Sequence, residues 1–180
     1  QLPKLGQVLG IPDSMTSGLT NQKKVTLLLK KELLTKRIPN QENPESKESQ
    51  DTYLSKLLEM GFGIEQVIDL DRDDITTFVD HYNSYEIPDD IIQAIALSEQ
   101  NRNLDLENKE LTTGQLCKII NTIDKEKLSE LLILNLNNNQ LTALPDSIGK
   151  LTALQVLTLS NNKLTALPNS FGELIALEYL

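Results

Sequence analysis

Cysteine and histidine are nearly absent from this chain of 180 residues, which has one of each, Cys117 and His81. A single cysteine excludes a disulfide within the chain and suits a reducing compartment, so we expect a cytoplasmic protein. Tryptophan is missing and aromatic residues make up only 4%, so a haem or flavin pocket is not expected. Apolar runs of membrane length and an N-terminal signal pattern are also missing, which predicts no membrane partner.

Catalytic patterns are lacking as well. Cys117 stands between the apolar residues Leu116 and Ile119 and is expected in a core, while His81 adjoins Tyr82 at the end of a helical pattern. The sequence has no metal-ligand spacing, no glycine-rich phosphate loop and no G-x-S-x-G elbow. We therefore predict no catalytic residue, no metal site and no cofactor, and a protein that is not an enzyme.

Positive charge is scarce over part of the chain. The formal net charge is −9, and residues 61–100 hold ten acidic residues but one basic residue, whereas residues 1–40 hold seven basic and two acidic ones. An acidic surface repels nucleic acid and favours a basic protein partner. The basic stretch lacks interleaved aromatic residues and is better interpreted as a solvated helix face, so no nucleic-acid partner is predicted.

What the chain does have is a repeat with a step of 23 residues. The step relates leucines, asparagines, prolines and glycines alike: Leu131, Leu154 and Leu177; Asn139 and Asn162; Pro145 and Pro168; Gly149 and Gly172. The pattern L-x-x-L-x-L-x-x-N-x-L at this spacing resembles the leucine-rich repeat. That resemblance implies one short parallel strand in each unit, stacked into a solenoid.

Residues 104–111 repeat the pattern imperfectly, with Lys109 in place of the asparagine. A helix capped by Thr113 and containing Cys117 is expected to follow, so this first unit has a longer return than the later ones. We assign residues 102–180 to the repeats. Another strand pattern begins as the chain stops at Leu180, so we expect a piece of a longer protein.

Alternation within each repeat separates two faces of a strand. Leu134 and Leu136 are expected to point into the core, and the residues between them to point outward. Asn139 and Asn162 stand where the chain leaves the strand and are expected to satisfy backbone groups there. The predicted concave, partner-binding face consists of Asp105, Glu107, Ile133, Asn135, Asn137, Val156, Thr158 and Ser160.

The residues before the repeats show helical patterns. We expect an N-terminal helical element over residues 1–38, with an amphipathic helix from Gln22 to Arg37 whose apolar stripe is Val25, Leu28, Leu29 and Leu33. A flexible linker is expected over residues 39–50, which has no apolar side chain. A small acidic helical bundle is predicted for residues 51–85, and a capping helix for residues 86–101. The fold class is therefore α/β, an N-terminal helical module followed by a leucine-rich-repeat solenoid.

The capping helix also resembles a ubiquitin-interacting motif. An acidic pair, Asp89 and Asp90, precedes an apolar stripe that ends in serine, formed by Ile91, Ala94, Ile95 and Ser98. The resemblance implies that this stripe contacts the apolar patch of ubiquitin, although Asn101 replaces the usual acidic residue at the end. The alternative is structural, because the same stripe suits a helix that covers the open end of the repeats. Exposure of the Ala94 face distinguishes the two.

A second segment, Leu54 to Phe62, looks like the first helix and Met-Gly-Phe loop of a ubiquitin-associated domain. The resemblance implies an apolar contact through Met60 and Phe62. The alternative is an ordinary helix end capped by Gly61.

These patterns together predict a non-enzymatic protein-recognition module. Repeats of this kind beside ubiquitin-type helices resemble bacterial effectors, which implies secretion into the cytosol of a host cell and ubiquitin as a candidate partner. Two alternatives remain: the substrate-recognition region of a ubiquitin ligase or deubiquitinase with its catalytic domain elsewhere, and a scaffold without ubiquitin contact.

Overall fold

A computed structural model describes residue 8, residues 13–35 and residues 52–180. The predicted linker over residues 39–50 lies outside the described residues. The chain divides into two compact units, residues 1–79 and residues 80–180. The division falls within one helix, α6 (Arg72–Ser84), and each unit is described by itself.

The first unit is helical. Its described elements are α2 (Asp13–Thr16), α3 (Asn21–Thr35), α4 (Thr52–Glu59), α5 (Ile64–Asp69) and the first part of α6. Helices α3, α4 and α5 contact one another. The core of the unit is made of Leu27, Leu54, Leu57, Met60, Phe62, Val67, Ile75, Phe78 and Val79.

Helix α3 packs in part with another face than the stripe predicted from the sequence. Val25 and Leu29 are more than half exposed, whereas Leu27 is fully buried. The partly buried residues near Leu27 in this helix include Lys24, Thr26, Leu28 and Lys31. Lysine stems can cover apolar surface while their ammonium groups stay in water, so a stripe that includes lysines is a possible packing face. The hydrophobicity of the residues in α3 therefore does not identify its packing face.

Helix α4 ends in a motif formed by glycine. Gly61 has a φ of 95°, a left-handed conformation that costs glycine little. The Gly61 amide donates to the Leu58 carbonyl at 3.1 Å, and the Phe62 amide donates to the Leu57 carbonyl at 3.0 Å. These two bonds are those of a Schellman helix end. Phe62 is thereby turned into the core, where its ring stacks on Phe78 with centroids 5.6 Å apart.

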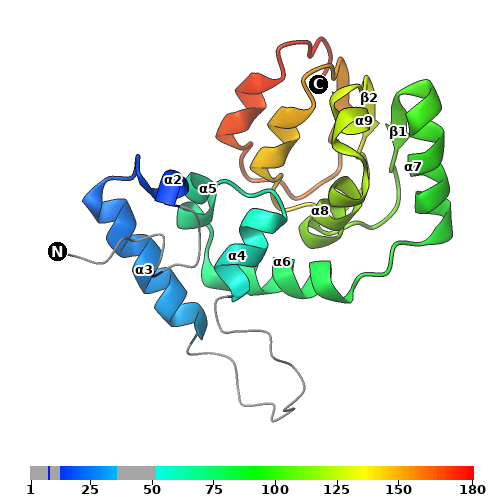
Figure 1. The fold of residues 1–180 in the computed structure, drawn as a ribbon. Coiled ribbons are helices and arrows are strands. Elements are labelled where there is room, and N and C mark those ends of the chain that lie inside the picture. Colours follow the sequence, from blue (N-terminus) through cyan, green and yellow to red (C-terminus); the bar gives the residue numbers. More distant parts are fainter. Residues whose placement is uncertain (1–7, 9–12, 36–51) are drawn as a thin grey trace. The chain divides into compact units, whose positions relative to one another are not determined.

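The second unit is built around a small parallel sheet. Strands β1 (Asn103–Asp105), β2 (Ile133–Asn135) and β3 (Val156–Thr158) lie side by side in that order (Figure 1). The register pairs Leu104 with Leu134 and Leu134 with Leu157. Mixed helices and strands, with one short parallel strand in each repeat, confirm the coarse fold predicted from the sequence.

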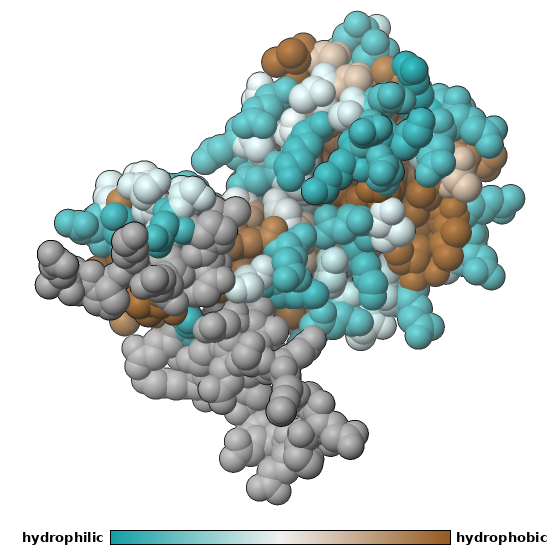
Figure 2. Space-filling model, in the orientation of Figure 1, coloured by the Kyte–Doolittle hydropathy of each residue, from teal (hydrophilic) through white to brown (hydrophobic). Residues whose placement is uncertain are grey.

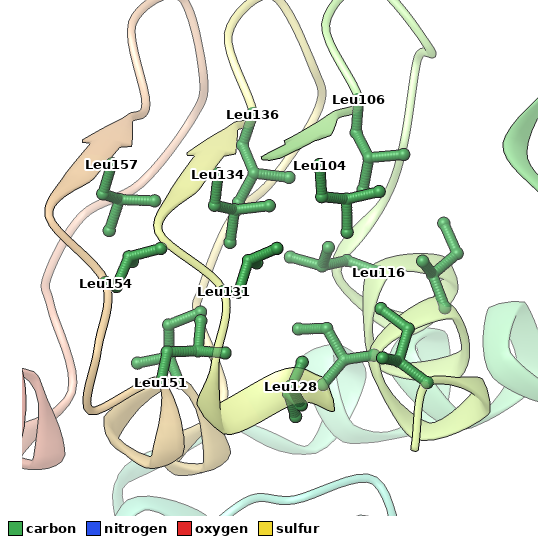
Figure 3. Close-up of a cluster of buried hydrophobic side chains, with 14 of the residues drawn as sticks. Leu104, Leu106, Leu116, Leu128, Leu131, Leu134, Leu136, Leu151, Leu154 and Leu157 are labelled. Carbon is green, nitrogen blue, oxygen red and sulfur yellow. The ribbon is translucent and has the colours of Figure 1, made fainter. Parts of the chain in front are cut away.

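Leucines of the three strands point to the same side and meet the leucines of the connecting segments. Figure 3 shows this core, with Leu104, Leu134 and Leu157 in one row and Leu131 and Leu154 below them. All five are buried. Leu159, which the alternation and the repeat step place inside like Leu136, is only partly buried. Each repeat therefore completes the core of the one before it.

The connections on the other side of the core differ in length. After β1 the chain forms α8 (Thr113–Thr122) and α9 (Lys125–Ser129), whereas the later units return through single 3₁₀ turns, η1 (Asp146–Lys150) and η2 (Asn169–Glu173). Thr113 was predicted to cap α8, but the cap is Thr112, whose amide donates to Gln115 Oε1. Thr113 instead accepts bonds from the amides of Thr142 and Ala143 in the next unit.

Helix α7 (Asp89–Asn101) lies beside β1 and covers that end of the sheet (Figure 1). It begins after Pro88, whose fixed φ suits the start of a helix. Ile91, Ile95 and Ser98 are buried, and Ala94 is partly buried against the same leucine core. The apolar stripe of α7 is therefore a packing face.

Candidate protein-binding face

Alternate side chains of the strands point away from the leucine core and form what we call the open sheet face. It consists of Asn103, Asp105, Glu107, Ile133, Asn135, Asn137, Val156, Thr158, Ser160 and Tyr179. All ten side chains are exposed or partly buried. Residues paired across a sheet point to the same side, so the register arranges them in rows that run from one repeat to the next.

Hydrogen bonds between side chains join the rows across the repeats. Asn135 Nδ2 donates to Glu107 Oε2 at 3.0 Å, and Asn135 Oδ1 accepts from Thr158 Oγ1 at 2.7 Å. The three residues belong to three successive units. Their rotamers are thus held in place before any partner arrives, which lowers the entropy cost of binding.

A second series of bonds lies where the strands end. Asn138 Nδ2 donates to Glu107 Oε1 at 2.9 Å, and Asn138 Oδ1 accepts from Asn161 Nδ2 at 2.6 Å. Asn138 and Asn161 have φ values of 55° and 56°. Asparagine tolerates this left-handed conformation better than most residues, which explains why it recurs at the position. Both oxygens of Glu107 therefore accept from asparagine amides.

Asn139 and Asn162 lie where the chain leaves the strands and stabilise the backbone there. Asn139 is buried, and its Nδ2 donates to the carbonyls of Leu106 and Leu136 at 2.9 and 3.0 Å. Asn162 Nδ2 donates in the same way to Leu136 and Leu159. These asparagines satisfy backbone acceptors that the turn leaves without partners. Their role is structural, as the sequence analysis predicts.

Lys109, which replaces the asparagine in the first unit, reaches the capping helix instead. Its Nζ lies 2.5 Å from Asp90 Oδ2. The hydrogen bond from Lys109 lowers the pKa of Asp90. Helix α7, and not another strand, lies next to β1 at this end of the sheet. An asparagine at position 109 would therefore have no preceding strand whose backbone it could bond. The ion pair joins the helix to the first repeat.

The residues of the ubiquitin-interacting resemblance are therefore divided between two environments. Asp89 and Asp90 are exposed. Ile91, Ile95 and Ser98 are buried, and the Ser98 hydroxyl donates to the Ile95 carbonyl at 2.7 Å within the helix. Contact with ubiquitin through this stripe would require α7 to leave the repeats. The large apolar residues that α7 exposes are Ile92 and Leu97. Figure 2 shows hydrophobic surface among hydrophilic residues on the second unit.

Met60 and Phe62, the residues of the ubiquitin-associated-domain resemblance, lie in the core of the first unit. The glycine-capped helix end described above accounts for their positions. An apolar contact through them would require that end of α4 to open.

Cys117 is fully buried in α8, and burial raises the pKa of its thiol. A protonated, enclosed thiol is a poor nucleophile. His81 is half-buried near the end of α6. Within the part of the chain that the structure describes, no three histidine, cysteine, aspartate or glutamate side chains are grouped as a metal would require.

Two members of the open sheet face, Asn103 and Tyr179, were missed in the sequence analysis. Asn103 pairs with Ile133, and Tyr179 forms an isolated parallel bridge with Val156. Both follow from the repeat step, since Tyr179 stands 23 residues after Val156 and Asn103 stands 30 residues before Ile133. The sequence analysis carried the outward row from Ile133 to Val156 but did not extend it back to Asn103 or on to Tyr179.

No helix within the described ranges has both the length and the hydropathy that crossing a membrane requires. No curated protein matches this chain. Residues 127–180, which contain β2, β3 and both 3₁₀ returns, match the model of the leucine-rich repeat family.

Proposed function

We propose that residues 102–180 form a leucine-rich-repeat solenoid whose open sheet face binds a protein partner, without catalysis. Leucine-rich-repeat domains commonly mediate protein–protein interaction, and residues 127–180 match that family. The observation that carries the proposal is the hydrogen-bonded row from Glu107 through Asn135 to Thr158. It orders polar side chains on a face that the fold leaves uncovered.

The polar row supports a binding role because core packing does not require it. Asn135 and Thr158 lie on the side of the strands opposite to the leucines, and Asn139 and Asn162 already satisfy the backbone at the strand ends. Pre-ordered polar groups beside apolar ones are typical of binding surfaces.

A pair of matched variants tests the proposal. Ser160→Arg adds a large charged side chain to the open sheet face, whereas Thr152→Arg adds the same side chain at an exposed position in the segment between η1 and β3. Immobilised wild-type and variant chains would be used to capture proteins from extracts of bacterial and eukaryotic cells. We expect a partner that the wild type and Thr152→Arg retain and Ser160→Arg loses. Equal retention by both variants would place the contact elsewhere.

The eukaryotic extract addresses the effector hypothesis, which rests on the sequence resemblance. A partner captured only from eukaryotic extract supports a protein that acts in a host cytosol. A partner found only in bacterial extract is the outcome against it.

Ubiquitin binding and a role beside a ligase or deubiquitinase domain remain hypotheses of the same origin. Burial of Ile91 and Ile95 favours the scaffold alternative, because a partner of that stripe would compete with the leucine core. Titration of labelled ubiquitin with this chain, followed by NMR, tests the point. Shifts at the apolar patch of ubiquitin that disappear with Leu97→Asp would identify the exposed side of α7 as the contact.

A further inference from the structure

Charge on the open sheet face is confined to its first repeat. Asp105 and Glu107 are its only ionisable members apart from Tyr179, and the later repeats contribute asparagine, threonine and serine in the same rows. Apolar side chains occupy the neighbouring row instead. An acidic end and an apolar row therefore meet on one surface.

Within the described residues, the two carboxylates accept hydrogen bonds from neutral donors only. Glu107 accepts from the neutral amides of Asn135 and Asn138, and Asp105 Oδ1 accepts from the Glu107 amide at 3.1 Å. Neither acid forms an ion pair with any residue that the structure describes. Their positions are fixed, and their negative charge is available to a partner.

The apolar row is formed by Ile133, Val156 and Tyr179. Ile133 is 36% exposed and Tyr179 is 67% exposed, and Val156 lies between them in the sheet. Side chains in such a row lie about 5 Å apart, which is the spacing of neighbouring strands. An apolar side chain laid along the row would bury surface from two repeats at once.

We propose that the open sheet face binds an extended protein segment in which a lysine or arginine lies about two residues from an apolar side chain. This inference rests on the proposed function and adds the chemistry of the partner. Ile133 pairs with Asn103 on the neighbouring strand, and Asp105 lies two residues after Asn103. Standard strand dimensions then place Asp105 about 8 Å from Ile133. Two residues of an extended segment span about 7 Å, so both contacts can be made together.

The charge pattern also determines which segments are disfavoured. An acidic side chain at the first repeat would face Asp105 and Glu107 at short range, and like charges held close together repel. A basic side chain would make charge-assisted hydrogen bonds with the same groups. The chain's net charge of −9 attracts a basic partner at longer range as well.

The test uses synthetic peptides of equal length and the whole chain, with binding followed by fluorescence anisotropy. The leucine–lysine peptide repeats Leu-Ser-Lys-Ser, which places leucine and lysine two residues apart on the same side of an extended chain. The leucine–glutamate peptide has glutamate in place of lysine, the leucine–serine peptide has serine there, and the serine–lysine peptide has serine in place of leucine. We expect the leucine–lysine peptide to bind most tightly, and its affinity to fall as salt is raised.

Three variants assign the contacts. Asp105→Asn keeps the acceptor for the Glu107 amide but removes the charge, and it should weaken the leucine–lysine peptide about fivefold, the upper end for an exposed ion pair. Ile133→Ser should weaken it as well. Glu126→Gln, which removes one exposed charge from α9, is the matched control and should have no effect. Circular dichroism of each variant establishes that the fold is retained.

Equal binding of the leucine–glutamate peptide, or leucine–lysine binding that Asp105→Asn does not weaken, would overturn the inference. Binding of the leucine–serine peptide that depends on Ile133 but not on Asp105 would also overturn it, while leaving the proposed function intact. If none of the peptides binds, the partner chemistry is wrong, and the capture experiment with Ser160→Arg still decides the proposed function independently.

Discussion

The backbone amide of Leu111 donates a hydrogen bond to the Oδ1 atom of Asn139, 28 residues later, at 2.9 Å. One repeat further along, the Leu141 amide donates to Asn162 Oδ1 in the same way, at 3.1 Å. The Oδ1 atom of each asparagine thus accepts from an amide of the preceding repeat. Its Nδ2 donates to one carbonyl of the preceding repeat and to one of its own repeat. A side chain that both donates and accepts is needed to join neighbouring repeats at this point.

Replacing Asn139 by alanine should therefore destabilise the chain strongly. The change leaves the Leu111 amide and the Leu106 carbonyl without their partner in a buried place, and we expect a loss of about 2–4 kcal/mol in the free energy of unfolding. Gln140→Ala, at the exposed neighbouring position, should change it by less than about 0.5 kcal/mol. Urea unfolding of the two variants measures the difference, and similar midpoints would contradict the structural role of Asn139.

Gly149 and Gly172 occupy equivalent positions in successive repeats but have different surroundings. A Cβ atom at position 149 would lie 2.6 Å from the Ser170 carbonyl oxygen, whereas one at 172 would meet nothing within 4 Å. Gly149→Ala should therefore lower the melting temperature, because η1 and η2 would have to separate. Gly172→Ala should leave it unchanged or raise it slightly, since alanine restricts the unfolded chain. The account fails if the two variants melt alike.

Leu157 tests the assignment of the two faces of a strand. Its side chain is fully buried between repeats, so Leu157→Ala should cost about 2–5 kcal/mol. Thr152→Ala, at an exposed position in the same unit, should be nearly neutral. Thr158→Ala should lie between them, because the Thr158 hydroxyl donates to Asn135. Chemical denaturation measures this order directly. If Thr158→Ala destabilised the chain more than Leu157→Ala, the assignment of the buried and exposed faces of the strand would be reversed.

Helix α7 offers a matched pair of alanines. Ala94 packs against the leucine core and Ala96 is exposed. Ala94→Asp would bring a charge to an apolar contact and should detach or unfold the cap, whereas Ala96→Asp should be tolerated. Thermal melts followed by circular dichroism compare them. If Ala94→Asp melts like the wild type, the stripe is free and the ubiquitin hypothesis regains support.

The repeats could be predicted from the sequence because one rule governs every residue of a unit. Alternation placed Leu134 and Leu136 inside and Asn135 outside, and the step of 23 residues carried the assignment to Leu157 and Thr158. The unnoticed members, Asn103 and Tyr179, obey the same rule. Strand pairing within such a short repeat is fixed by its pattern, since a slip of one residue would expose the leucines.

The helices could be predicted less well, because an apolar stripe does not say what it packs against. Ile91 and Ile95 fit both a ubiquitin contact and a cap, and only the three-dimensional neighbours distinguish them. In α3, the lysines on either side of Leu27 concealed the packing face, whereas Val25 and Leu29 suggested another. Side-chain stems of lysine contribute to packing but count as polar in a sequence pattern.

Site-specific photo-crosslinking tests the central claim that the open sheet face contacts a protein. A photoreactive phenylalanine analogue would replace Ile133, which is exposed on that face, and in a second sample Thr152, which is exposed in the segment between η1 and β3. Irradiation of each sample in cell extract, followed by electrophoresis, reveals covalent products. The account predicts a discrete protein adduct from position 133 that position 152 does not give. An adduct from position 152 alone, or the same adducts from both, would contradict it.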